Sequence, residues 1–243
     1  MPGKRILILG GTGEARALAN RLIDAGHGVV TSLAGVTQAP HLPEGEVRRG
    51  GFGGAQGLAA YLRDGGFKIL IDATHPFAAQ MSRHAAGAAK ACGLPLYRLE
   101  RPAWAAEEGD RWIGAATVAA AVALLPAGAR VFLTIGRKEA GAFLARADLH
   151  GIMRMIEAPT EELPPRWNLI LARPPFTVAG ERELLTANRI THVVSKNAGG
   201  QATRAKLIAA RETKIPVVMI ARPAKPAAVI MASVDAAFRL LSP

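Results

Sequence analysis

The feature that most constrains this chain is a regular alternation of short apolar runs and helical patterns, joined by glycine-rich turns. The first apolar run, 4–9, ends at Gly10, and Ala15, Leu18 and Leu22 then mark one face of a helix. Further apolar runs follow at 28–33, 68–73, 94–99, 130–134, 152–156, 168–172, 192–195 and 216–220. These runs are almost continuously apolar, which is typical of parallel strands covered on both faces. We therefore expect an α/β fold with parallel sheets flanked by helices.

The polar, irregular stretch at 100–114 divides this alternation and is the expected linker. It predicts two Rossmann-like halves, an N-terminal cofactor-binding domain at 1–100 and a C-terminal substrate-binding domain at 114–243. Ligands of open α/β sheets sit at the carboxyl ends of strands, so we expect a ligand cleft between the halves.

Two short echoes relate the halves. The segment 9–15 resembles 134–140, and the segment 73–77 resembles 172–176. Both resemblances are weak, and the first joins two strand-to-helix turns. We interpret them as a sign of two Rossmann-like halves, with a chance similarity in an alanine- and glycine-rich chain as the alternative.

The net charge indicates the class of ligand. Lysine and arginine number 30 against 19 acidic residues in a chain of 243, a net charge of +11 that attracts polyanions. The basic residues are dispersed, in runs no longer than two, and are not interleaved with aromatic residues, so we expect no nucleic-acid partner. A small ligand with many carboxylates or phosphates fits this pattern, and so does a generally basic enzyme.

Several classes of protein and site are excluded. The longest apolar stretch, 115–125, has about 11 residues where a membrane span needs about 20, so we expect a soluble, cytoplasmic protein without a membrane partner. Cys92 is the single cysteine, which excludes disulfides and a thiolate metal site. No histidine and carboxylate cluster has metal-ligand spacing, and no metal is expected.

The turn after the first apolar run has the composition of a phosphate-binding turn. Glycines let the backbone approach a dinucleotide pyrophosphate, and the N–H groups that open the next helix attract anions. Its residues are Gly10, Gly11, Thr12, Gly13 and Glu14. Arg16 stands where a strict G-x-G-x-x-G pattern has its last glycine, so a tight turn without a ligand remains the alternative.

The end of the second apolar run bears on the choice of cofactor. NAD-binding folds usually place an acidic residue there to hold the ribose hydroxyls. Here Thr31 and Ser32 are followed by no acid until Glu44, and Arg48 and Arg49 are close by. If a dinucleotide binds, this pattern favours NADPH over NADH.

His75 follows the third apolar run, at the edge where ligands of this fold class bind. It is the candidate catalytic residue, with a structural histidine as the alternative. We expect Asp72 to be a strand-end residue that bonds the backbone or Thr74.

The second half has its own candidate anion sites. The turn after 192–195 is rich in N–H donors and cations, which suit ligand carboxylates; a solvated helix start is the alternative. The candidate substrate-binding residues of this half are Gly136, Arg137, Lys138, Lys196, Asn197, Gly199, Gly200, Arg204 and Lys206.

Taken together, the motifs resemble the precorrin-6A reductase family of cobalamin (vitamin B12) biosynthesis. The resemblance covers almost the whole chain and rests on segments 10–16, 32–35, 51–54, 72–78 and 195–200, together with Lys206, Arg222 and Pro223. Two positions depart from the family pattern. Val36 stands where relatives often carry a basic residue, and Asn197-Ala198 replaces a more usual Asn-Ser pair.

The resemblance implies an oxidoreductase that uses NADPH to reduce one double bond of the acidic, ring-contracted tetrapyrrole precorrin-6A, giving precorrin-6B. Hand-over of the product to other cobalamin-pathway enzymes is also expected. The cofactor would supply the hydride, and a side chain or water the proton. The implied cofactor-binding residues are Gly10, Gly11, Thr12, Gly13, Glu14, Ser32, Ala34, Gly35, Gly53, Thr74, His75 and Pro76; Arg16 joins the substrate-binding set.

One other class of reductase is disfavoured, and two alternative functions stay open. A short-chain-like reductase would carry a Tyr-x-x-x-Lys pair, but Gly65 and Arg101 stand four residues after Tyr61 and Tyr97. An NADPH-binding regulatory or sensor protein, and a reductase of another polyanionic small molecule, remain as alternatives.

Overall fold

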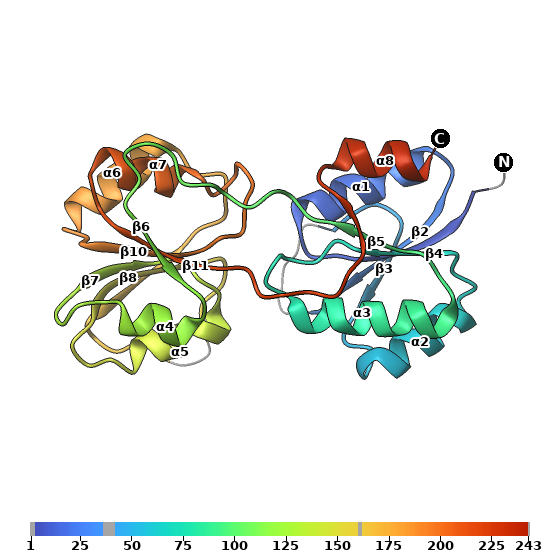
Figure 1. Cartoon of the computed structure of the whole chain (residues 1–243), viewed down its shortest axis with the longest axis horizontal. Helices are drawn as coiled ribbons and strands as arrows, with labels where there is room; N and C mark the ends of the chain where they lie inside the picture. The colour runs from blue at the N-terminus through green and yellow to red at the C-terminus, as the bar shows by residue number, and fades with distance from the viewer. Residues whose placement is uncertain (1–2, 36–41, 160–161, 243) are drawn as a thin grey trace. The chain divides into compact units, whose positions relative to one another are not determined.

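The computed structural model of the chain describes residues 3–35, 42–159 and 162–242. It divides into two compact units (Figure 1). Unit 1 contains Met1–Pro102 and Pro223–Pro243, and unit 2 contains Ala103–Arg222.

Unit 1 is a six-stranded parallel sheet in the order β12-β5-β4-β1-β2-β3. Its strands are β1 (Arg5–Leu9), β2 (Gly28–Leu33), β3 (Glu46–Arg49), β4 (Ile69–Asp72), β5 (Leu96–Leu99) and β12 (Val229–Met231). Its helices are α1 (Gly13–Asp24), α2 (Gly54–Asp64), α3 (Ala79–Cys92) and α8 (Val234–Leu241). Helices α1 and α8 cover one face of the sheet, and α2 and α3 cover the other (Figure 1).

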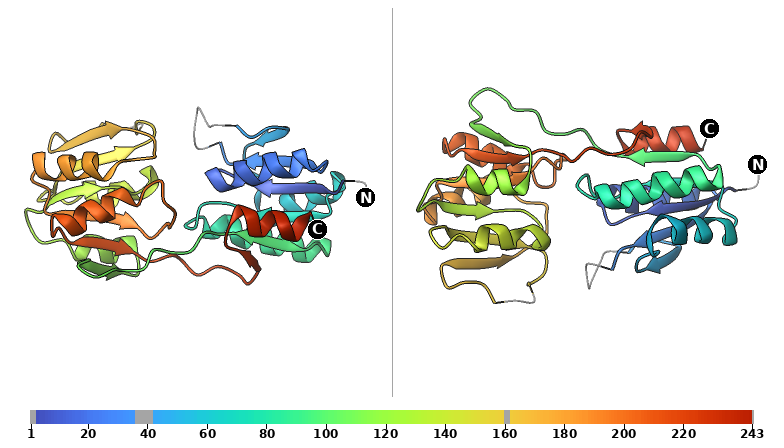
Figure 2. Two further views of the ribbon diagram at one scale, coloured as in Figure 1. Left: turned by 90° about the horizontal axis from the view of Figure 1, so that it is seen from above. Right: turned by 60° about the horizontal axis from the view of Figure 1, so that its bottom comes forward.

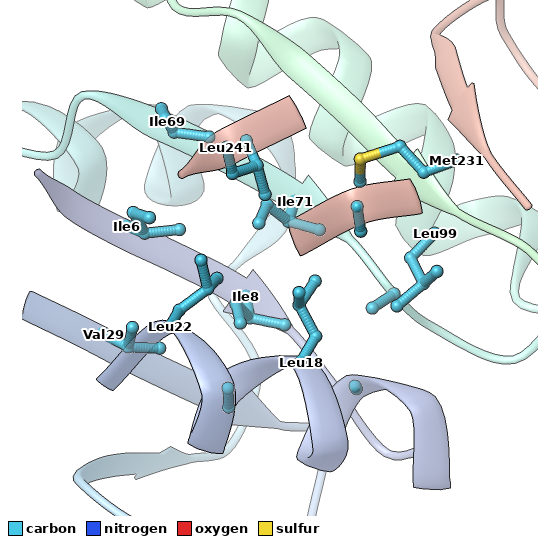
Figure 3. Close-up of a cluster of buried hydrophobic side chains, with 14 residues drawn as sticks. Ile6, Ile8, Leu18, Leu22, Val29, Ile69, Ile71, Leu99, Met231 and Leu241 are labelled. Atoms are coloured by element: carbon cyan, nitrogen blue, oxygen red, sulfur yellow. The ribbon is translucent and has the colours of Figure 1, made fainter. Parts of the chain in front are cut away.

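The central strand β1 of unit 1 is apolar on both sides because both faces of the sheet are covered. Alternate side chains of one strand enter different cores, so that Ile6 and Ile8 pack under α1 and α8 while Leu7 packs under α2 and α3. Figure 3 shows the first core, in which Leu18 and Leu22, one helical turn apart on α1, lie against the sheet.

Unit 2 repeats this plan with the strand order β6-β11-β10-β7-β8-β9, again all parallel. Its strands are β6 (Trp112–Ala115), β7 (Arg130–Leu133), β8 (His150–Met155), β9 (Trp167–Leu171), β10 (His192–Lys196) and β11 (Val217–Ile220). Its helices are α4 (Val118–Ala123), α5 (Arg137–Leu144), α6 (Val178–Ala187) and α7 (Ala205–Glu212). Helices α4 and α5 cover one face and α6 and α7 the other (Figure 1).

The two strand orders make β7 the counterpart of β1, and β9 the counterpart of β3. The echo between 9–15 and 134–140 therefore joins equivalent turns, as expected. The echo between 73–77 and 172–176 does not, because the first segment follows β4 and the second follows β9.

The expected boundaries need two corrections. The presumed linker at 100–114 contains most of β6, which pairs with β11. The chain beyond 222 does not stay with the second half but returns to unit 1, where β12 pairs in parallel with β5 (Figure 2). The reason is burial: Met231 of β12 and Leu241 of α8 complete the core between the sheet and α1, each 2% exposed.

No helix among the described residues is long and apolar enough to cross a membrane.

Candidate active site

The glycine turn after β1 lies at the point where the strand order of unit 1 reverses, between β1 and β4. A Cβ on Gly10 would lie 2.9 Å from Cγ2 of Thr31, so this position is closed to larger residues. Gly11 has a φ of +110°, and a Cβ on Gly11 or Gly13 would meet no atom within 4 Å. The turn is therefore closely packed at Gly10 and has open space beside Gly11 and Gly13. Such open space is what a phosphate needs to approach the backbone.

Thr12 caps α1 and joins the turn to the neighbouring strand. Its Oγ1 accepts a hydrogen bond from the N–H of Ala15 at 3.0 Å and donates to the carbonyl of Ala73, just after β4, at 2.9 Å. The first N–H groups of this 12-residue helix lack intrahelical partners and attract anions. The carboxylate of Glu14, in the first turn, is held by Arg101 with both oxygens 2.8 Å from Nη1.

Asp72 ends β4 and organises the loop that follows. One carboxylate oxygen accepts from the hydroxyl of Thr74 at 2.6 Å; the other accepts from Ser82 at 2.6 Å and from Nε of Arg98 at 3.1 Å. Burial alone would raise the pKa of Asp72, but the hydrogen bonds from Ser82, Thr74 and Arg98 outweigh it and lower the pKa. The expected bond between Asp72 and Thr74 is confirmed.

Sequence reasoning missed Arg98. Its guanidinium lies in the buried strand β5, bonds Asp72 and donates from Nη1 to the carbonyl of Pro226 at 2.9 Å. It therefore ties the returning chain to the loop after β4. The available signal was an arginine between Tyr97 and Leu99 in an otherwise apolar strand.

His75 is exposed at the carboxyl end of β4, as the sequence predicts. Its Nδ1 accepts a hydrogen bond from the N–H of Phe77 at 3.3 Å, and the two rings lie 5.8 Å apart between centroids. This hydrogen bond ties the His75 ring to its own loop through Nδ1.

Each expected cofactor-binding residue of unit 1 lies near the carboxyl end of one of the strands β1 to β4. Ser32 lies within the last two residues of β2, and the others follow their strand. The structure thus gathers at one edge of the sheet Gly10, Gly11, Thr12, Gly13, Glu14, Ser32, Ala34, Gly35, Gly53, Thr74, His75 and Pro76. Arg16 lies in α1, half-buried. Val36 lies outside the described residues.

The equivalent turn of unit 2 is filled rather than open. Nζ of Lys196 lies 2.6 Å from Oε1 of Glu139, and a Cβ on Gly136 would lie 3.2 Å from Oε2 of Glu139. A carboxylate of the chain itself thus stands at this turn. The difference from Gly11 and Gly13 makes unit 1 the half whose turn is suited to a dinucleotide.

The loop after β10 has a structural role that the sequence did not reveal. The Asn197 side chain accepts from the N–H of Trp104 at 2.8 Å and donates to its carbonyl at 3.0 Å. Gly200 accepts from the Trp104 indole at 2.9 Å, and Gly199 and Gly200 have φ values of 71° and 84°. These residues anchor the segment with which the chain begins unit 2.

The expected cations of unit 2 differ in their availability. Lys206 is buried, donates to the carbonyl of Thr203 at 2.8 Å and lies over the Trp104 ring. Arg204 pairs with Glu107. Arg137 at the start of α5 is exposed, and the side chain of Lys138 lies outside the described part.

Burial lowers the pKa of Lys206 to about 7; Arg154 acts in the same direction and Glu181 opposes it. A direct contact between this ammonium and a ligand does not fit its position in the interior.

Within the ranges that the structure describes, no group of three or more histidine, cysteine or acidic side chains is arranged to hold a metal ion.

Comparison with known proteins decides the family. The family model of precorrin-6x reductase CbiJ/CobK matches residues 5–242. The chain belongs to this family. It is 53% identical to a precorrin-6A reductase of Rhodococcus erythropolis, over 92% of this chain and 91% of the relative, and 49% identical to that of Rhodobacter capsulatus, over 95% and 93%. A solved structure named CobK precorrin-6A reductase has a TM-score of 0.93 at 48% identity, covering 98% of this chain and 96% of that one.

Membership in the precorrin-6x reductase family agrees with the parallel α/β architecture of both units and makes the chain an oxidoreductase. A reductase of this family takes a nicotinamide cofactor.

Proposed function

We propose that this chain reduces one double bond of the ring-contracted tetrapyrrole precorrin-6A, with NADPH, to give precorrin-6B in cobalamin biosynthesis. The observation that carries the proposal is the family match over residues 5–242, with identities near one half to relatives named precorrin-6A reductase.

The residues at the carboxyl edge of unit 1 fit a dinucleotide. The open turn at Gly11 and Gly13 and the free N–H groups of α1 would hold the pyrophosphate. No acidic residue lies between Ser32 and Gly35 to compete with a phosphate on the adenosine ribose, which favours NADPH.

When bound, the cofactor supplies the hydride, and a proton must reach the neighbouring ring atom. The chain's part is to fix the distance and the face of approach. Thr12 and Asp72 hold the turn and the His75 loop in one arrangement through their hydrogen bonds to Ala73 and Thr74. The His75 imidazole would donate to the cofactor or the macrocycle, as an orienting group or as the proton source.

Cations at the carboxyl edge of unit 2 would bind the substrate's carboxylates. Arg137 is exposed, and Lys196 is held at this edge by Glu139. Both side chains offer charge-assisted hydrogen bonds. We assign the substrate chiefly to these two.

The experiment mixes the purified protein with NADPH and precorrin-6A made in place by the preceding enzymes, and follows the absorbance of the reduced cofactor. We expect oxidation that depends on precorrin-6A. Binding of NADPH without turnover would favour a sensor protein, and turnover only with other polyanions would favour a different reductase.

The substrate assignment has its own test. Arg137→Glu should raise the Michaelis constant for the tetrapyrrole and spare NADPH affinity. Arg111→Glu is the matched control, because Arg111 is exposed but precedes β6, at the opposite edge of the sheet. Equal Michaelis constants in both variants would contradict the placement.

A further inference from the structure

The end of β3 carries an arginine that the sequence could not distinguish from its neighbour. Arg48 pairs in register with Ser32 of β2, and Arg49 pairs with Leu33. Side chains alternate along a strand, so Arg48 and Arg49 point to opposite faces of the sheet. Arg48 is half-buried, and its Nη1 lies 3.5 Å from the Ser32 hydroxyl.

The Arg48 guanidinium is locked in place. Nη1 donates to the carbonyl of Gly50 at 2.6 Å, and Nη2 donates to the carbonyl of Gly51 at 2.7 Å. Cζ of Arg48 lies 3.8 Å from the centroid of the Phe52 ring and 5.2 Å from the centroid of the Tyr61 ring. A group held this way loses little conformational freedom when it binds a ligand.

The positive charge of Arg48 is also not neutralised. Among the described residues no carboxylate forms an ion pair with it, and the nearby Glu46 faces Arg5 instead. Nε–H and the second Nη2–H of Arg48 donate to no acceptor among the residues that the structure describes. The Nε–H and Nη2–H groups form a planar pair of donors on a guanidinium whose charge no carboxylate neutralises, and such a pair is a suitable partner for a phosphate dianion.

The location of Arg48 identifies that phosphate. In dinucleotide-binding sheets the adenosine ribose lies at the carboxyl end of β2, and a nearby arginine accommodates a 2′-phosphate. Ser32 is the residue of β2 at that point. We propose that Arg48 binds the 2′-phosphate of NADPH through Nε–H and Nη2–H and sets the preference over NADH, while Arg49 has no part in it. This assignment rests on the proposed function, since it needs the dinucleotide in unit 1.

The test compares Arg48→Met with Arg49→Met, measuring by calorimetry the dissociation constants of NADP⁺, NAD⁺, 2′,5′-ADP and 5′-AMP. We expect Arg48→Met to weaken NADP⁺ and 2′,5′-ADP by about 10- to 150-fold, as charged hydrogen bonds of about 1.5–3 kcal/mol imply. NAD⁺ and 5′-AMP should change by about twofold or less, and Arg49→Met should resemble the parent. Arg48→Lys keeps a cation but lacks the two planar donors of a guanidinium, so its dissociation constant for NADP⁺ should lie between those of the parent and Arg48→Met. It also provides the test if Arg48→Met fails to fold.

The outcomes separate this assignment from the proposed cofactor. A parent that prefers NADP⁺ and keeps this preference in Arg48→Met overturns the role of Arg48 and leaves the cofactor standing. Equal losses for NADP⁺ and NAD⁺ also overturn it, because Arg48 would then only hold the Gly50–Gly51 loop. A parent that binds both cofactors equally overturns the cofactor choice and the assignment together.

Discussion

Nε of Arg98 lies 3.1 Å from Oδ2 of Asp72, with the two side chains only 5% and 1% exposed. Removing one member of such a pair leaves the other charge buried. We predict that Arg98→Met lowers the free energy of unfolding by about 3–5 kcal/mol, measured by urea denaturation. The exposed pair of Arg21 and Asp235 is the control, and Arg21→Met should cost about 1 kcal/mol or less. A loss below about 1 kcal/mol in Arg98→Met would mean that Ser82 and Thr74 alone satisfy Asp72.

The same pair predicts acid sensitivity. The folded state lowers the pKa of Asp72, so its contribution is present above the ordinary carboxyl range and is lost as the pH falls through the folded value. Asp72→Asn should therefore flatten the acid side of the stability curve. Parallel curves for parent and variant below pH 4 would contradict this.

Burial of Lys206 predicts that the stability of the fold also depends on pH in the alkaline range. With a folded pKa of about 7 against an ordinary 10.5, the unfolded chain binds more protons between these values. Stability should therefore rise with pH in this window, by about 1.4 kcal/mol per unit from this group alone.

Lys206→Met isolates that contribution, since Glu181 keeps its ion pair with Arg154. The variant should be at least as stable as the parent at pH 7, with its advantage shrinking toward pH 9.5. Chemical denaturation at several pH values measures the difference. A constant difference between the two proteins would mean that the ammonium stays charged in the interior.

His75 is predicted to affect rate rather than stability. Its side chain is exposed, and its ring lies 5.8 Å from the ring of Phe77 between centroids. In single-turnover hydride transfer, His75→Ala should lose about 100- to 10,000-fold if His75 supplies the proton, with an unchanged melting temperature. His75→Gln retains a donor and should recover part of an orienting role. Parental rates in both variants would assign the proton to solvent or another residue.

Ser32→Asp is predicted to reverse the cofactor preference. The new carboxylate would lie beside Arg48, neutralise it and repel a 2′-phosphate, while offering an acceptor to a ribose hydroxyl. Affinity for NADPH should fall more than affinity for NADH, in a titration of cofactor fluorescence. Ser82→Ala, which alters a serine away from β2, is a control for general loosening. Parallel losses of both cofactors in Ser32→Asp would contradict the prediction.

Most of the fold was predictable because the central strands of both sheets are buried on two faces and read as apolar runs. What escaped prediction depends on contacts distant in sequence. β3 is short and polar, and β12 has only three residues, of which Val229 and Ile230 are exposed. Helix α8 carried a readable signal, an N-cap at Ser233 with apolar residues one turn apart, but nothing local assigned it to unit 1.

The site shows the same division. The glycine turn, Thr74 and His75 lie at one sheet edge because strand ends in parallel sheets coincide, which spacing alone predicts. The partners of Asn197 and Lys206 could not be predicted, since Trp104 approaches both only in the folded unit.

The return of the chain to β5 also sets an order of events during synthesis. The six described strands of unit 2 lie in one continuous segment, whereas unit 1 lacks β12 and α8 until residues 229–241 have left the ribosome. Unit 1 is thus begun before unit 2 and completed after it. Until then the edge of β5 is unpaired, and the apolar side of α1 lacks the contacts of Met231 and Leu241. A chain cut short after residue 222 would therefore leave the core of unit 1 open to solvent.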